Sequence, residues 1–160
     1  MEKIVYTPIG IIRSAYKHTE GVPIQSTAAA GSKGSVEIAK TFEPGLEDLG
    51  GFSHVILLYH FHRAGKYRLR VQPFLDNHRR GLFATRAPAR PNAIGLSVVH
   101  LIKIVGNVLL VDDLDILDGT PLLDIKPYVP PFDQVGSYDI GWMEKHIHKL
   151  NHTASDDRFS

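Results

Sequence analysis

Short apolar runs rich in Ile, Val, Leu and Tyr recur along this chain, with turn-forming residues between them. Runs of this length and composition favour β-strands over helices. Strands are predicted at residues 3–13, 35–41, 53–62, 94–105, 107–117 and 121–126. The chain is therefore expected to be mainly β.

Two dipeptides between these runs predict tight hairpin turns. Gly106-Asn107 separates one pair of apolar runs, and Asp118-Gly119 separates another. Two-residue loops of this composition join antiparallel strands. We therefore predict a single, largely antiparallel β-barrel-like domain. No G-x-G-x-x-G motif follows a predicted strand, so a Rossmann fold is not expected.

Helical signals are few. A short helical turn is predicted at 44–49, and a C-terminal helix at 140–150, where Met143, Ile147 and Leu150 recur at helical spacing.

The end of the chain differs in character from the rest. Residues 151–160 are polar and are expected to be frayed. The predicted organisation is a barrel domain over 1–135, followed by a helical segment and tail over 136–160.

Composition indicates one soluble cytoplasmic domain. The chain has 160 residues and no cysteine, which excludes disulfides and thiolate zinc sites. Its N-terminus lacks an apolar export segment, and no apolar run approaches the ~18 residues of a membrane span.

Charge is distributed unevenly along the chain. Residues 63–90 contain eight Lys or Arg and one acid, Asp76, whereas residues 112–139 contain seven Asp and one Lys. A basic segment of this kind is a plausible footprint for a polyanion such as RNA. The alternative is that it pairs with the acidic segment.

One loop concentrates polar groups between prolines. Arg86 and Arg90 alternate with Pro88 and Pro91, which limits the entropy lost when the guanidinium groups are held in place. Guanidinium groups suit a carboxylate or phosphate, but these two could instead pair with the Asp-rich segment. Asn92 offers a donor and an acceptor that could read an adenine edge, or it forms a turn only.

Histidines raise the question of a metal. His54, His60 and His62 share one face of a predicted strand and could hold zinc if a third ligand came from elsewhere. No carboxylate lies nearby in the sequence, so no metal is predicted.

Several blocks of this sequence together resemble one known family. They are Ile9–Ser14, Pro23–Gln25, Gly51–Ile56, Phe61-His62, Gly81–Ser97 and Leu114–Tyr128. In this order, over about residues 4 to 130, they resemble the TrmO-like (YaeB or TsaA-like) family of S-adenosylmethionine-dependent methyltransferases. Characterised bacterial members methylate threonylcarbamoyladenosine beside the tRNA anticodon. The longer members carry an extra C-terminal domain, for which this sequence shows no counterpart.

The resemblance implies an enzyme that methylates N6 of threonylcarbamoyladenosine in the tRNA anticodon loop. It also implies a homodimer with S-adenosylmethionine near the subunit interface. The implied cofactor contacts are Gln25, Ser26, Thr27, Phe61, His62, Arg86, Leu96, Asp118, Gly119, Thr120 and Pro121. Among them, Arg86 is expected to grip the methionine end, and Asp118 to accept hydrogen bonds from the ammonium or ribose. Gln25 lies in a Gly/Ala/Ser-rich stretch typical of a loop that could close over a ligand.

Chemistry suggests the remaining roles. Asp124, Lys126 and Tyr128 alternate along a predicted strand, so they could share one face and assist removal of a proton from N6. The alternative is a salt-bridged strand end. Contacts to tRNA are predicted for Arg63, Arg68, Arg79, Arg80, Arg90 and Asn92. Two other functions stay open: methylation of a small molecule, and a non-catalytic module that binds S-adenosylmethionine or RNA.

Overall fold

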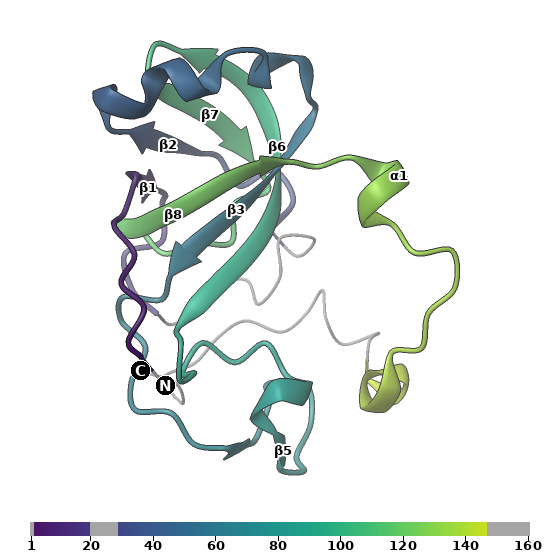
Figure 1. Ribbon diagram of the computed structural model, residues 1–160. Coiled ribbons are helices and arrows are strands. Elements are labelled where there is room, and N and C mark those ends of the chain that lie inside the picture. The colour runs from purple at the N-terminus through teal and green to yellow at the C-terminus, as the bar shows by residue number, and fades with distance from the viewer. Residues whose placement is uncertain (1, 20–28, 147–160) are drawn as a thin grey trace.

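Six antiparallel strands close into a barrel in the computed structural model, which describes residues 2–19 and 29–146 (Figure 1). Around the barrel, the strands follow the order β1-β2-β7-β6-β3-β8. Their bounds are Gly10–Arg13 (β1), Gly34–Ile38 (β2), His54–His60 (β3), Ile94–Val105 (β6), Val108–Asp112 (β7) and Thr120–Pro127 (β8). The predicted antiparallel barrel is confirmed.

The barrel interior is filled by aliphatic side chains from every strand. Fully buried examples are Ile12 on β1, Val36 on β2, Leu57 on β3, Leu109 on β7 and Leu122 on β8. Burying one such side chain contributes roughly 1.5–3 kcal/mol, so the closed barrel supplies the main stabilisation of the fold.

The hairpin between β6 and β7 is as predicted. Val105 pairs with Val108 across Gly106-Asn107, and Gly106 has the positive φ of 57° that such turns require. β6 itself spans the predicted residues 94–105.

Three strand predictions were wrong at their ends. The strand predicted at 35–41 ends at Ile38, and a 3-10 helix begins at Lys40. Strand β1 begins only at Gly10, and Ile4 and Val5 before it are 73% and 78% exposed, so their apolar character reflects no barrel pairing. Strand β7 ends at Asp112 because Asp113 turns the chain with a φ of 62°. Residues 113–117 nevertheless reach the core, where Leu114 is fully buried, which explains their apolar pattern.

The Asp118-Gly119 turn exists but does not form the predicted hairpin. The Thr120 amide donates to the Leu117 carbonyl (3.3 Å), which closes the turn. The residues before it pair with no strand; instead, the amides of Asp118 and Gly119 donate to the carbonyls of Tyr16 and Ile12. The turn therefore ties the start of β8 to β1.

Short helical turns occupy both predicted helical regions. The 3-10 helices η2 (Lys40–Leu46) and η3 (Leu49–Gly51) pack Leu46 and Leu49 against the barrel core. A single α-helical turn, α1 (Pro130–Asp133), follows β8, and the 3-10 helix η5 (Gly141–Lys145) lies where a longer helix was predicted. The rest of that prediction, and residues 151–160, lie outside the described residues.

Residues 63–90, hereafter the basic lobe, project from one end of the barrel (Figure 1). The lobe contains the small sheet β4 (Arg70–Val71) with β5 (Arg80–Gly81), and the 3-10 helix η4 (Leu82–Ala84). Val71, Leu82 and Ala87 form its own apolar core. The lobe and η5 are joined by the Trp142 indole, which donates to the Ala84 carbonyl (2.8 Å).

Candidate functional site

The turn that begins β8 holds a charged carboxylate. Asp118 Oδ1 accepts a hydrogen bond from the Ser14 amide (3.0 Å), and Oδ2 lies 2.7 Å from Lys17 Nζ. Its bond to Lys17, followed by the Ser14 amide, lowers the pKa of the Asp118 carboxyl, so this group is ionised at neutral pH. Sequence reasoning missed Lys17, which is separated from Asp118 by most of the chain.

Thr120 and His62 meet at the same end of the barrel. The buried Thr120 hydroxyl donates to the Leu117 carbonyl (2.7 Å) and lies 3.3 Å from His62 Nδ1. Since that hydroxyl has given its only proton to Leu117, it accepts from His62, which places the imidazole proton on Nδ1. Burial, followed by the charges of Arg63 and His60, lowers the pKa of His62. His62 is therefore neutral at pH 7, with Nε2 as an acceptor.

A buried polar chain runs along the inside of this barrel end. Tyr59 Oη lies 3.1 Å from Ser97 Oγ, and Ser97 Oγ donates to Asp115 Oδ1 (2.7 Å). Tyr59 and Ser97 are only 5% and 4% exposed. Sequence reasoning did not single out these three residues, because they are far apart in the chain. The only signal was an acid placed between Leu114 and Ile116 in an apolar run.

Gly95 makes room for this chain. A Cβ at Gly95 would collide with the Tyr59 ring and lie 2.9 Å from Phe61 Cζ. Phe61 packs edge-on against Tyr59, with ring centroids 5.3 Å apart. The predicted cofactor residue Phe61 thus also holds Tyr59 in position.

The loop that carries Arg86 is fixed on both sides of it. The Thr85 hydroxyl donates to the Leu82 carbonyl (2.8 Å). Arg90 Nη1 donates to the carbonyls of Thr85 (3.0 Å) and Ala87 (3.3 Å), and its guanidinium lies over the Phe83 ring at 5.8 Å. Arg90, predicted to contact tRNA, therefore clamps the backbone that flanks Arg86.

Arg86 lies within electrostatic reach of the buried chain. Burial raises the pKa of Asp115 and of Tyr59, and in both cases the charge of Arg86 opposes the rise.

Leu96 belongs to the outer face of the barrel. Its side chain is 51% exposed, and in the sheet it pairs with Leu58, which pairs in turn with Asp124. Asp124 thus shares a row of the sheet with Leu96, about 10 Å away across two strand spacings.

Of the other two predicted catalytic residues, Lys126 lies farther along β8, and Tyr128 directly follows the end of that strand. Lys126 forms an ion pair with Asp124 (2.7 Å), as expected for alternate residues on one face. Tyr128 packs edge-on against His54, with ring centroids 6.3 Å apart. Lys126 lies six positions after Thr120, about 20 Å along a strand, so these side chains are not brought next to the Thr120–His62 pair.

A groove of about 530 Å³ lies beside η2 and η3. Phe42, Leu46, Phe52 and Ile125 give it an apolar lining, and Asp124 borders it. It lies at the opposite end of β8 from the turn at Leu117–Thr120.

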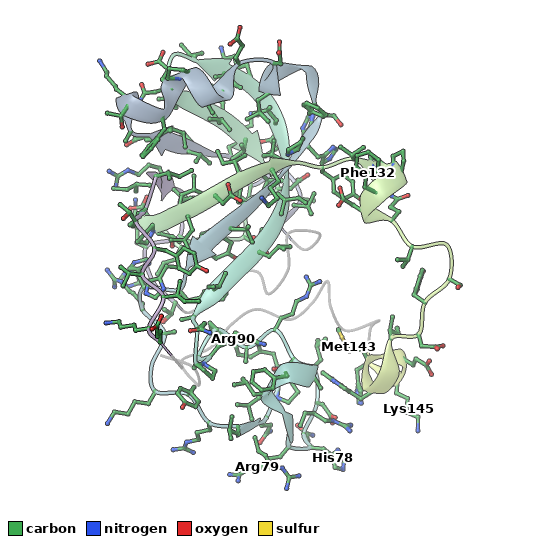
Figure 2. The ribbon with its side chains drawn as sticks, in the orientation of Figure 1. His78, Arg79, Arg90, Phe132, Met143 and Lys145 are labelled. Carbon is green, nitrogen blue, oxygen red and sulfur yellow. The ribbon has the colours of Figure 1, made fainter. Side chains whose placement is uncertain are left out.

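The predicted RNA contacts fall into two groups. Arg63, Arg68, Arg79 and Asn92 are exposed, and Figure 2 shows Arg79 at the tip of the lobe, far from the barrel. Arg80 is held by the buried Asp76 (2.9 and 2.5 Å) and lies over the Trp142 ring at 5.3 Å. Arg80 therefore stabilises the lobe.

Some predictions have no structural counterpart to report. Gln25, Ser26 and Thr27 lie outside the described residues. Within residues 2–19 and 29–146, no group of three or more His, Asp or Glu side chains is placed to hold a metal ion. The described part of the chain has no helix that is both long and apolar enough to cross a membrane.

The fold and site define a closed antiparallel barrel whose polar groups gather at the start of β8, an architecture distinct from Rossmann methyltransferases. Residues 11–134 match the family model of the tRNA-methyltransferase O N-terminal domain. The chain therefore belongs to the TrmO family, which confirms the resemblance predicted from its sequence blocks.

Similar proteins have been named in several organisms. A Pyrococcus abyssi protein, named a probable S-adenosyl-L-methionine-binding protein, is 55% identical over 156 residues, which cover 98% of this chain and 85% of that protein. The mouse tRNA (adenine(37)-N6)-methyltransferase is 37% identical over 157 residues, which cover 94% of this chain but only 36% of the mouse protein.

Solved structures agree with the family assignment. The crystal structure of TrmO from Pseudomonas aeruginosa superposes with a TM-score of 0.75 at 39% sequence identity. The match covers 89% of this chain and 62% of that one, so the chain spans less than two thirds of that TrmO.

Proposed function

We propose that this protein transfers a methyl group from S-adenosylmethionine to N6 of threonylcarbamoyladenosine in the tRNA anticodon loop. The names of the relatives support the cofactor and the class of enzyme, a tRNA adenine-N6 methyltransferase. The threonylcarbamoyl group is the finer part of the proposal and rests on the resemblance alone.

The observation that carries the proposal is the turn at Leu117–Thr120, which brings several predicted cofactor contacts to one end of the barrel. Asp118 is fixed there as an anion, and Thr120 fixes His62 as a neutral acceptor. Arg86 lies in the field of Asp115 at the same end.

The chemistry of these groups fits S-adenosylmethionine. A guanidinium suits its carboxylate, the Asp118 carboxylate suits its ammonium or ribose, and Phe61 and Leu96 offer apolar surface to its adenine. When bound, S-adenosylmethionine supplies the methyl group.

The chain's own residues contribute chiefly by orientation, because a displacement at carbon depends on holding the reacting groups aligned. The closed barrel and the clamped loop around Arg86 provide fixed positions for this purpose. Asp124, with Lys126 as its ion-pair partner and Tyr128 beyond it, is the proposed acceptor of the N6 proton. Asp124 is favoured because it shares a row of the sheet with Leu96.

The basic lobe is the proposed docking surface for tRNA. Exposed Arg63, Arg68 and Arg79 are available to phosphates, and the acid of the lobe, Asp76, is buried and bound to Arg80.

We further propose a homodimer. The barrel is closed, so unpaired strand edges no longer supply a reason to associate. Exposed apolar side chains supply one instead: Ile94 and Leu96 on β6 are 41% and 51% exposed. Light scattering at micromolar concentration should give twice the chain mass, and a monomer with full cofactor affinity would contradict the dimer.

A deletion strain tests the proposed function in the cell. Nucleosides from its tRNA, analysed by mass spectrometry, should lack the methylated form of threonylcarbamoyladenosine and accumulate the unmethylated form. Re-introduction of the wild-type gene should restore the mark. An unchanged nucleoside profile would favour the alternative of a small-molecule methyltransferase.

A further inference from the structure

A phenylalanine lies exposed on the surface of the basic lobe. Phe83, in the middle of η4, is 74% exposed, and the apolar core of the lobe forms without it, from Val71, Leu82 and Ala87. Burial of the ring would stabilise the lobe, so the fold does not explain its exposure. Single exposed apolar side chains are common on protein surfaces, but this one differs in how it is held.

The backbone is fixed on both sides of Phe83. The Leu82 amide donates to the Leu69 carbonyl (2.9 Å), and the Ala84 carbonyl accepts from the Trp142 indole (2.8 Å). The ring therefore projects from an anchored turn, and only its side-chain torsions remain to be ordered when a ligand binds. An aromatic side chain in this setting offers a large contact area at a low entropy cost.

One face of the ring is covered by a cation that is itself held in place. The Arg90 guanidinium lies over the Phe83 ring, 5.8 Å from its centroid. Nη1 of Arg90 donates to the carbonyls of Thr85 and Ala87, so the guanidinium keeps this position and orients the ring. Since 74% of the residue stays exposed, the opposite face is open to a flat ligand.

The charge of the lobe indicates which flat ligand fits. Arg63, Arg68 and Arg79 are exposed on the same lobe and suit phosphates. A ligand that combines phosphates with a flat π-face is a nucleotide. Bases of a duplex are stacked on one another, so only the unpaired bases of a loop or an end can stack on an aromatic side chain.

We propose that Phe83 is a stacking platform for an unpaired base of the RNA that docks on the basic lobe. This inference rests on the proposed function, in which an anticodon loop is the substrate, and it assigns a contact to one base of that loop. Because η4 leads directly into the loop that carries Arg86, a base stacked on Phe83 is bound beside the predicted cofactor contacts.

Replacement of Phe83 separates stacking from phosphate binding. The probe is a synthetic anticodon stem-loop RNA, whose affinity is measured by fluorescence anisotropy at several salt concentrations. In Phe83→Ala the affinity should fall about 10-fold, as expected for one stacked base. The slope of log affinity against log salt should not change, because no phosphate contact is lost. Phe83→Trp should restore most of the affinity, whereas Phe83→Leu, which has no π-face, should not.

Three controls accompany this measurement. Phe132 is 83% exposed on α1, away from the lobe (Figure 2), and Phe132→Ala should leave RNA affinity unchanged. A fully paired RNA of equal length should bind to the wild type and Phe83→Ala with affinities within about twofold of each other. Calorimetry should give the same affinity for S-adenosylmethionine in both proteins, as expected if the loop after η4 keeps its structure.

Stem-loops that each lack one loop base then identify the stacked position. Removal of the stacked base should cost the wild type about 10-fold in affinity and should cost Phe83→Ala almost nothing further.

The outcomes are distinguishable. If the wild type binds no RNA, the proposed function fails and the platform with it. If the wild type binds the stem-loop and Phe83→Ala binds it equally well, the platform is overturned while the proposed function stands. A shallower salt slope, an equal loss for paired RNA or a loss of S-adenosylmethionine affinity in Phe83→Ala would also overturn the platform. So would light scattering that shows a dimer in the wild type and a monomer in Phe83→Ala, since the ring would then be a contact between copies.

Discussion

Single residues at this site serve the fold and the site together. Gly119 adopts a φ of 76° in the turn, and its neighbour Asp118 ties that turn to Ser14 and Lys17. Replacing such a residue is expected to change both the stability of the protein and its affinity for the ligand. Arg86 differs, since its backbone is fixed by Arg90 and Thr85, and its side chain is therefore the cleaner probe of binding.

Replacement of Arg86 should weaken cofactor binding selectively. Loss of a charge-assisted hydrogen bond to the cofactor carboxylate should cost about 1.5–3 kcal/mol in Arg86→Ala. Arg86→Lys should recover only part of that, since an ammonium lacks the planar fork. Calorimetry measures both, with Arg68→Ala on the exposed lobe surface as control. Equal affinities in wild type and Arg86→Ala would refute the role.

Asp76 should make the lobe sensitive to acid. Hydrogen bonds from His78 and then Arg80 lower the pKa of the Asp76 carboxyl in the folded protein. The folded state therefore binds its proton less readily than the unfolded chain. The stabilisation is fully present above the unfolded pKa of about 3.9 and is lost as pH falls below it.

The single tryptophan reports this transition, because Trp142 stacks on Arg80. Its fluorescence should change in the wild type as pH falls below about 4. In Asp76→Asn that change should be absent, and the lobe should be destabilised already at neutral pH. An identical acid transition in both proteins would contradict this assignment.

Strand β6 has residues that alternate between the barrel interior and its outer face. Gly95, Ser97, Val99 and Leu101 face the barrel interior, while Ile94 and Leu96 face outward. This alternation runs from Ile94 to Leu101, beyond which the pairing of β6 with β7 shifts register. The bounds of the strand could be predicted because the apolar run continues to the Gly106-Asn107 turn. The one inward position without a side chain is Gly95, where Tyr59 and Phe61 occupy the space.

Gly95→Ala should therefore disturb both stability and the site. Overpacking of this kind costs about 1–3 kcal/mol, and displacement of Tyr59 should break its bond to Ser97. Thermal unfolding measures the loss. Gly81→Ala provides the control, since a Cβ there meets nothing within 4 Å. Equal melting temperatures in the two variants would show that the barrel tolerates the extra methyl group.

The sequence predicted the strands correctly only where alternating apolar residues also pair with a neighbouring strand. The strands and the Gly106-Asn107 hairpin were predictable because alternation and turn residues agreed. Residues 113–117 were predicted as strand because the apolar residues Leu114 and Ile116 alternate with polar positions. These two side chains are buried in the core, but the segment pairs with no strand. The Tyr59–Ser97–Asp115 chain was not predictable, since only closure of the barrel brings these residues together.

In the whole molecule, the exposed positive charges of the basic lobe lie apart from the apolar core of the barrel. The barrel carries the apolar interior, and the basic lobe carries exposed arginines at a distance from it (Figure 2). A polyanion bound to the lobe would be positioned mainly by phosphate contacts. Of the arginines predicted to contact RNA, Arg80 and Arg90 have structural partners, so Arg68 and Arg79 are the more informative sites for mutation.

Charge reversal at Arg68 and Arg79 should raise the KM for tRNA about 10-fold or more and leave cofactor affinity unchanged, because only phosphate contacts are lost. The slope of log affinity against log salt should become shallower by about 2, one for each contact. Lys103→Glu, at an exposed site on β6, is the control. An unchanged salt slope in the double variant would place the RNA elsewhere.

Methyl transfer to threonylcarbamoyladenosine can be measured with purified protein in one assay. Purified protein is incubated with labelled S-adenosylmethionine and with tRNA that either carries or lacks the threonylcarbamoyl group, and label is located by nucleoside analysis. We expect label at N6 of threonylcarbamoyladenosine in the first tRNA and none in the second. The proposed function is contradicted if neither tRNA accepts label while a pool of small metabolites does, or if both tRNAs are labelled equally.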